Sequence, residues 1–141
     1  MVGAQEINAP VRVGDVLPEL VLLAIDRTLL CRFAGASGDF NPIHIDIDLA
    51  RRAGMPDVIV HGMLGMTWLG RLLTGWRPQS HLRSFSVRFV ALTHLGNQPV
   101  LRGQVIELLE EGGQPLARVA VEMLNQYGQL KIEGEALVAL G

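Results

Sequence analysis

Residues 61–76, HGMLGMTWLGRLLTGW, have the composition of a single long helix. Their apolar side chains leave no wide polar face, which is typical of a helix enclosed by the rest of its domain. Interior glycines weaken such a helix in isolation, each by up to about 1 kcal/mol relative to alanine, but they let another backbone approach closely. We therefore expect this helix, near 63–75, to be stabilised by packing inside a sheet.

The segments that follow Pro78 have the pattern of strands rather than of helices. Val119, Val121 and Met123, for example, alternate with polar or small neighbours. Turn residues separate the last three segments. The predicted strands are LRSFSVRFVAL (82–92), VLRGQVIELLE (100–110), LARVAVEML (116–124) and LKIEGEALVAL (130–140). The sequence thus predicts an α+β domain in which an antiparallel sheet wraps one long helix.

The N-terminal half predicts one further strand and two further helices. The apolar run ELVLLAI, residues 19–25, has the length of a strand. Asp26 can cap a helix over 27–36, and Asp46 or Asp48 can cap a second, short helix.

The bulk composition describes one domain without a dominant charge. Its length of 141 residues suits a single domain, 1–141, and its net charge of −2 offers no basic surface for nucleic acid or an anionic membrane. The longest apolar segment, 62–76, is shorter than the roughly 20 residues that cross a bilayer. Cys31 is the only cysteine, which excludes an intrachain disulfide and fits a reducing, cytoplasmic location. We expect Cys31 to lie in the core.

A polar loop, ASGDFNPIHID at 36–46, carries the candidate chemistry. Pro42 fixes its own φ and keeps Asn41 out of the helical region, so no helix runs through and the loop is stiff. Such a loop can hold the Asp39 carboxylate and the His44 imidazole at a fixed separation, where they can orient a water molecule and take its proton. The alternative is an ordinary turn, in which Asp39 and Asn41 bond to nearby backbone and His44 is exposed. Spacing alone leaves both open.

Gly62 begins the long helix, directly after His61. The first N–H groups of a helix have no partner inside it and lie at the positive end of its dipole. The Gly62 N–H could therefore bind an acceptor, for which a thioester carbonyl that develops negative charge is one candidate, or the glycine could serve close packing alone. We expect a structural role for His61. The usual zinc, nucleotide and serine-nucleophile motifs are absent from the sequence, so we predict no metal site.

Residues 33–64, FAGASGDFNPIHIDIDLARRAGMPDVIVHGML, resemble the hydratase motif of MaoC-like proteins, the (R)-specific enoyl-CoA hydratases of the hotdog fold. The family pattern is F-A-x-x-S-x-D-x-N-P-x-H-x-D, followed by an apolar strand that leads into H-G-M. The resemblance implies a hotdog fold, with a long central helix wrapped by a curved antiparallel sheet. It also implies a homodimer whose sheets pair edge to edge.

The resemblance further implies an activity. This is the reversible hydration of trans-2-enoyl thioesters, or dehydration of (R)-3-hydroxyacyl thioesters, carried by CoA or an acyl carrier protein. Asp39 and His44 would activate water for addition to C3 and deliver a proton to C2. The Gly62 N–H would bind the thioester carbonyl, and Asn41 would shape the loop. Neither a metal nor a redox cofactor would be required.

Two side chains on the first predicted C-terminal strand are candidates for the CoA phosphates. Arg83 and Arg88 carry guanidinium groups, whose paired N–H donors match phosphate oxygens. The alternative is that both arginine side chains contact only solvent and bind no phosphate.

Two other functions stay open from the sequence. A hotdog thioesterase would share the acyl-thioester site, but its usual carboxylate lies on the central helix, and residues 63–75 contain no Asp or Glu. The second open function is that of a partner subunit in a heteromeric dehydratase. Intact Asp39 and His44 count against an inactive subunit, but not against a paired one.

Overall fold

The computed structural model describes residues 10–141, so residues 1–9 of the predicted domain 1–141 lie outside the described part. It confirms the α+β class, with a helical N-terminal half followed by one long helix and an antiparallel sheet. The helices are α2 (Arg27–Ser37), α3 (Ile47–Arg52) and α4 (Gly62–Trp76), with 3-10 turns η1 (Pro42–His44) and η2 (Gln79–His81). The strands are β1 (Leu20–Val21), β2 (Leu82–Phe89), β3 (Val100–Glu111), β4 (Gln114–Leu124) and β5 (Leu130–Ala139).

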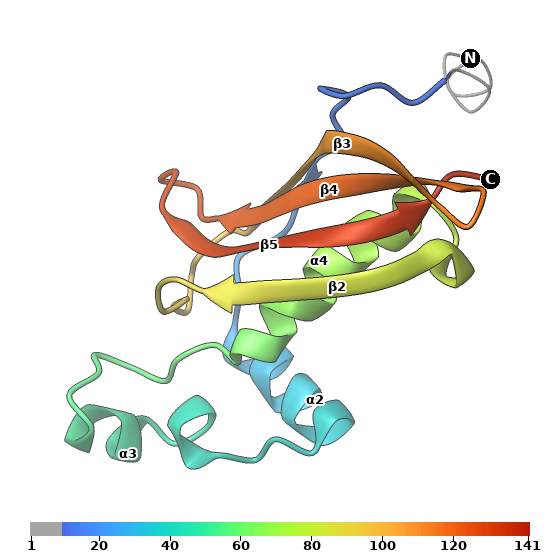
Figure 1. Cartoon of the computed structure of the whole chain (residues 1–141). Helices are drawn as coiled ribbons and strands as arrows, with labels where there is room; N and C mark the ends of the chain where they lie inside the picture. The colour runs from blue at the N-terminus through green and yellow to red at the C-terminus, as the bar shows by residue number, and fades with distance from the viewer. Residues whose placement is uncertain (1–9) are drawn as a thin grey trace.

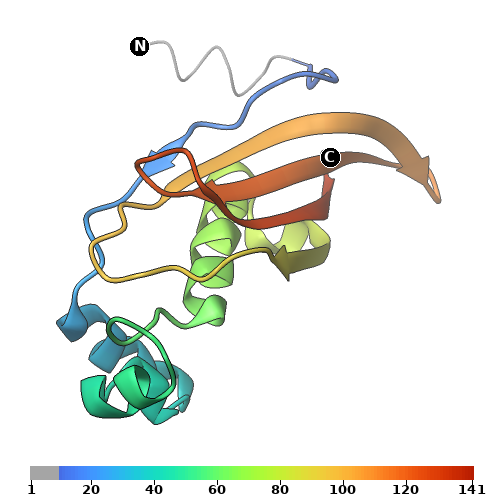
Figure 2. The same cartoon turned by 90° about the vertical axis from the view of Figure 1, so that its left-hand side faces the viewer.

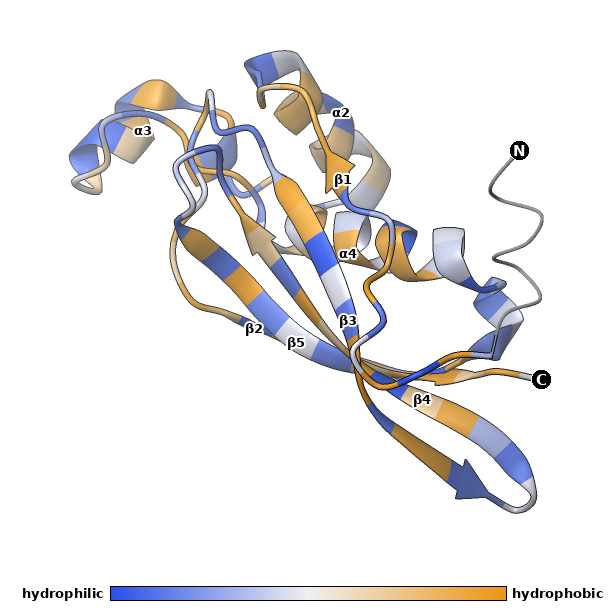
Figure 3. Ribbon diagram, turned by 90° about the horizontal axis from the view of Figure 1, so that it is seen from above, coloured by the Kyte–Doolittle hydropathy of each residue, from blue (hydrophilic) through white to orange (hydrophobic). Residues whose placement is uncertain are grey.

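The sheet has five strands in the order β1-β3-β4-β5-β2, and every pair is antiparallel. It arches over α4, as two perpendicular views show (Figures 1 and 2). Hydrophilic and hydrophobic residues alternate along the strands (Figure 3). On β4, Val119, Val121 and Met123 are at most 2% exposed. The predicted alternation is therefore confirmed, and it directs the apolar face of the sheet toward α4.

The long helix α4 is enclosed on one side only. Its buried side chains, Leu64, Trp68, Leu69, Leu72 and Leu73, pack into the core. Thr67, Arg71 and Thr74 are exposed, and Met63 is 54% exposed. Thr67, Arg71 and Thr74 are spaced by four and three positions, so they form a narrow solvent-exposed strip along one side of α4. The prediction of a helix buried nearly all round is therefore wrong for this single chain. Within residues 10–141, no helix has both the length and the apolar content to cross a bilayer.

Two predictions for the N-terminal half are wrong. Only Leu20 and Val21 of the predicted strand 19–25 lie in a strand, because β1 meets just the first two residues of β3. Leu23 is 91% exposed. Cys31 is exposed rather than in the core. On α2 the buried positions are Leu30 and Ala34, which lie four residues apart on one face of the helix. Cys31 follows Leu30 directly in the sequence, so its side chain points away from that face.

The predicted helix starts are confirmed. The Asp26 carboxylate accepts a hydrogen bond from the Leu29 N–H at 2.8 Å and caps α2, and Asp46 caps α3 in the same way. The helix α2 ends at Gly38, whose φ of 76° is in the left-handed region that favours glycine. The chain then enters the polar loop, and α2, the loop and α3 lie together at the end of the molecule where α4 begins (Figure 1).

Gly134 of β5 provides a test of how closely β2 and β5 pair in the sheet. It pairs with Val87 of β2 and Val121 of β4, and a Cβ on it would lie 2.1 Å from the Ser86 carbonyl oxygen. Because the obstructing atom belongs to the backbone, we expect Gly134→Ala to lower the free energy of unfolding by about 2–3 kcal/mol in urea titrations. The control is Gly35→Ala on α2, where a Cβ meets nothing within 4 Å. That change should raise stability by up to about 1 kcal/mol. Equal effects of the two variants would contradict the close pairing of β2 and β5.

Candidate active site

The polar loop is held by hydrogen bonds between its own side chains and backbone. The Asp39 Oδ1 accepts from the Asn41 N–H at 3.2 Å, and the Asn41 Oδ1 accepts from the Ile43 N–H at 3.1 Å. The Ser37 hydroxyl accepts from the Asp39 N–H at 3.1 Å. Asp39 and Asn41 therefore make the local bonds expected of a turn, but these use only one carboxylate oxygen of Asp39. Its Oδ2 remains available.

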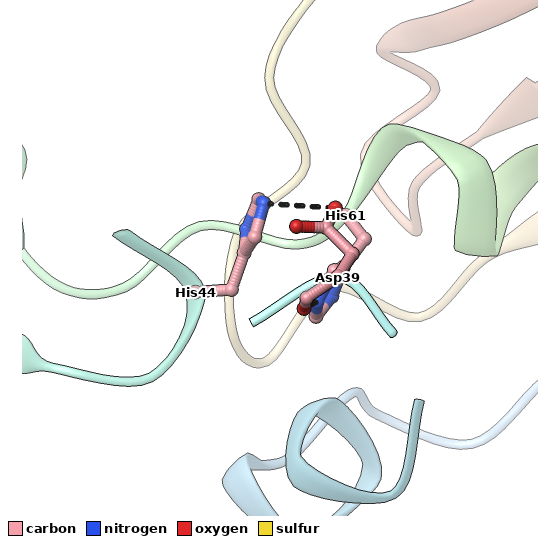
Figure 4. Close-up of side chains that lie close together, drawn as sticks. All are labelled: Asp39, His44 and His61. Atoms are coloured by element: carbon pink, nitrogen blue, oxygen red, sulfur yellow. Dashed lines mark hydrogen bonds and ion pairs between the residues drawn. The ribbon is translucent and has the colours of Figure 1, made fainter. Parts of the chain in front are cut away.

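His44 faces that free oxygen. Its Nε2 lies 3.8 Å from the Asp39 Oδ2, as the dashed line in Figure 4 shows, and its side chain is only 11% exposed. The alternative of an exposed His44 is therefore wrong. Its Nδ1 lies 2.8 Å from the Ile59 carbonyl oxygen, which can only accept, so the Nδ1 of the neutral ring carries the proton. The Nε2 is left with a lone pair, and 3.8 Å is too long for a direct bond. One water molecule could donate to both atoms.

His61 packs against both candidate residues. It is 1% exposed, and its Nε2 lies 3.1 Å from the Asp39 carbonyl oxygen, to which it donates. Its ring stacks on the ring of His44, with centroids 3.9 Å apart and planes at 24°. Phe33 meets it edge-on from α2, with centroids 4.9 Å apart. These contacts describe the structural role expected of His61: it holds the backbone of Asp39 and the ring of His44.

The burial of His61 predicts a pH dependence of stability. Burial lowers the pKa of His61 below its ordinary value of 6.5. The unfolded chain therefore takes up this proton at a higher pH than the folded chain, and the free energy of unfolding falls as the pH drops below about 6.5. We expect His61→Phe, which preserves a flat ring, to lose less stability than the parent between pH 7.5 and 5.5 in urea titrations. Parallel pH profiles would show that His61 does not contribute.

Gly62 places a backbone donor at the same site. It is the first residue of α4, and within residues 10–141 no group accepts a hydrogen bond from its N–H. A cavity of about 140 Å³ is lined by both His44 and Gly62, and its other walls are largely apolar. The imidazole and the helix N-terminus, 18 positions apart in the sequence, thus border one small space.

The neighbouring loop after β2 holds this arrangement in place. The Val60 N–H donates to the Thr93 carbonyl at 3.0 Å, and Ile59 forms a β-bridge with His94. Lys131, which is 5% exposed, donates from its Nζ to the Leu92 carbonyl at 2.7 Å. The strand pattern around Lys131 carries no signal for this buried contact, so sequence reasoning missed it.

The three side chains Asp39, His44 and His61 offer ligand atoms within 4.8 Å of one another. A metal ion binds in the plane of an imidazole ring, at about 2.0–2.1 Å for zinc. The His44 and His61 planes are only 24° apart in a stack, so their lone pairs cannot both point at one ion. The donor set therefore fits a metal poorly as it stands, and the absence of a metal stays a prediction.

The predicted CoA contacts lie elsewhere on the sheet. Arg88 pairs with Glu133, and it alternates with Val87 and Phe89, so it points to the face opposite α4. Arg83 donates to the Ser80 carbonyl at 2.6 Å. The structure thus brings Asp39, Asn41 and His44 together in the loop and places His44 and Gly62 on one cavity, which neither arginine lines. Their contact with the CoA phosphates stays a prediction.

Comparison with known proteins identifies the family. A sequence model of the MaoC-like domain matches residues 18–123. The mitochondrial 3-hydroxyacyl-[acyl-carrier-protein] dehydratase of Arabidopsis thaliana is 29% identical over 130 residues, 92% of this chain and 77% of its own length. The (R)-specific enoyl-CoA hydratase of Aeromonas caviae is 33% identical over 110 residues, 77% of this chain and 81% of its own length.

Among solved structures, the (R)-hydratase of A. caviae involved in PHA biosynthesis superposes with a TM-score of 0.82 at 28% identity, and the match covers 93% of this chain and 98% of that one. The predicted hotdog fold is confirmed by this likeness together with the five-stranded antiparallel sheet around α4. The family model alone covers more than half of the sequence. The chain belongs to the MaoC-like domain family.

Proposed function

We propose that this chain catalyses the (R)-specific hydration of trans-2-enoyl thioesters and the reverse dehydration, with Asp39 and His44 activating the water. The observation that carries the proposal is the 3.8 Å separation of the Asp39 Oδ2 and the His44 Nε2, with His44 bordering the same cavity as Gly62. Two relatives are named for opposite directions of one class of reaction, an enoyl-CoA hydratase and a 3-hydroxyacyl-[acyl-carrier-protein] dehydratase, and they confirm the expected hydro-lyase class.

The proposed reaction begins with a water molecule that donates one hydrogen bond to each member of the pair. As its oxygen attacks C3, one water proton passes to the pair, and the electrons of the C2=C3 bond move toward the thioester carbonyl oxygen. The Gly62 N–H stabilises the negative charge that develops there. The pair then returns a proton to C2, so one water adds across the double bond. The balance involves protons only and needs no redox cofactor.

The Asp39–His44 pair and the Gly62 N–H are of the kinds that give large rate effects in enzymes. A positioned acid or base contributes about 10²–10⁴-fold, and one donor to a developing oxyanion about 3–4 kcal/mol. The orientation of His44 supports its role, because the Ile59 carbonyl keeps the Nδ1 protonated and leaves the Nε2 as the base. The thioesterase alternative lacks such support, since α4, residues 62–76, contains no carboxylate.

The proposal is tested with crotonyl-CoA and the purified chain. We expect the absorbance of the conjugated enoyl group to fall, and chiral chromatography of the hydrolysed product to yield the (R)-3-hydroxy acid. A thiol reagent in a parallel reaction reports hydrolysis of the thioester. Release of free CoA without loss of the double bond would replace the proposal with a thioesterase, and an (S) product would overturn the proposed stereochemistry.

We further propose that two copies pair edge to edge, as the family resemblance implies, and that the free edge of β2 is the edge they use. That strand lies at one end of the sheet order, and exposed edges normally need a partner or a cover. Phe89, the last residue of β2, is 50% exposed, and the adjacent Val90 is 45% exposed. Sedimentation of the purified chain should yield a dimer, whereas a monomer that becomes active only with a second protein would favour the heteromeric alternative. A cytoplasmic location stays a prediction.

A further inference from the structure

The cavity that borders His44 and Gly62 is small. Its volume is about 140 Å³. For scale, an apolar cavity of about 150 Å³ engineered in another protein binds one benzene molecule, which has six heavy atoms. A crotonyl group has four carbons and a carbonyl oxygen, so it is of similar size, whereas an octenoyl group has nearly twice as many heavy atoms.

The inner end of the cavity is closed by two side chains of the sheet. Met123 of β4 and Ile132 of β5 pair directly across the two strands and line the cavity. They are 1% and 2% exposed. A Cβ on Gly65 of α4 would lie 2.3 Å from the Ile132 Cδ1 and 3.1 Å from the Met123 Cε. These two side chains therefore already occupy the space between the helix and the sheet, even with a glycine opposite.

A longer acyl chain has two ways to fit, and neither is favourable. It could displace Met123 and Ile132 inward, but protein interiors are close-packed, and added volume in such a place strains the neighbours. It could instead turn outward past Phe89 and Leu92, which line the cavity and are 50% and 43% exposed. In that direction the acyl chain leaves the cavity, and within one chain each extra methylene stays in contact with water, so it gains little free energy of burial from the cavity walls.

We propose that this site takes short enoyl thioesters, with the crotonyl group as the best fit, and that Met123 and Ile132 set the length limit. This inference rests on the proposed hydratase function. One methylene in a shaped apolar pocket changes kcat/KM by roughly 10–200-fold. We therefore expect the second-order rate constant to decline steeply once the chain exceeds the cavity.

The first experiment measures kcat/KM for the four-, six-, eight- and ten-carbon trans-2-enoyl-CoA thioesters with the full chain. We expect the eight-carbon substrate to react at least about tenfold less efficiently than the four-carbon one. An equal or higher value for the eight-carbon substrate overturns the length limit and leaves the hydratase function standing. Failure of every length to react overturns both.

The second experiment opens the inner end of the cavity. In Ile132→Ala, the ratio of eight-carbon to four-carbon kcat/KM should rise about tenfold. Ile132→Val removes only the Cδ1 that faces Gly65, so it preserves folding and should raise the ratio in the same direction by a smaller factor. The control is Val119→Ala, because Val119 is buried on β4 but does not line the cavity. An unchanged ratio in both Ile132 variants, or an equal rise in the control, overturns the role of Ile132.

Discussion

Asp39→Asn and His44→Ala are each expected to lower the rate of crotonyl-CoA hydration at least about a hundredfold while the protein remains folded. The asparagine retains a side-chain oxygen that can accept from the Asn41 N–H, so the loop bond observed at 3.2 Å survives. What it loses is the negative charge at the position of Oδ2, 3.8 Å from the His44 Nε2. The alanine removes the base itself.

The measurement is the steady-state loss of enoyl absorbance, with circular dichroism and urea unfolding to verify the fold. Asp48→Asn is a matched control, because it makes the same chemical change at an exposed position on α3 and should leave the rate unaltered. The double variant should be little slower than the slower single variant, since the two residues act as one unit. Parent-like rates in either folded single variant would eliminate the Asp39–His44 assignment.

Gly62→Pro is expected to lower kcat by about 10²–10³-fold, because it deletes the one N–H proposed to bind the carbonyl. Proline is well suited to the first position of a helix, where the N–H has no internal partner. It also requires an extended residue before it, and His61 already has φ −57° and ψ 127°. The substitution therefore removes the donor with little disturbance of α4.

Gly62→Ala is the control for the added bulk. A Cβ at this position would lie 3.0–3.3 Å from the ring of Phe89, so both variants press on the same half-exposed ring. The alanine variant retains the N–H and should be far more active than the proline variant. Comparable kcat values for the two would show that Phe89 contact, and not the lost donor, explains the effect.

Much of the fold could be predicted because its signals are local. The caps at Asp26 and Asp46 and the strand alternation around Val119 each depend on residues a few positions apart. The errors arose where distant partners decide. The run 19–25 is apolar enough for a strand, but only Leu20 and Val21 have a neighbour on β3 to pair with.

The candidate site also combines features that the sequence predicts with contacts that only the structure shows. The sequence by itself determined the stiff loop around Pro42, the presence of Asp39 and His44 on it, and a helix that begins at Gly62, because backbone restrictions and helix ends are local properties. Only the tertiary structure decided that Ile59 holds the proton on the Nδ1 of His44, that His61 stacks on the His44 ring, and that Met123 and Ile132 line the cavity. Those contacts join segments far apart in the chain, and their geometry follows from the packing of the sheet around α4.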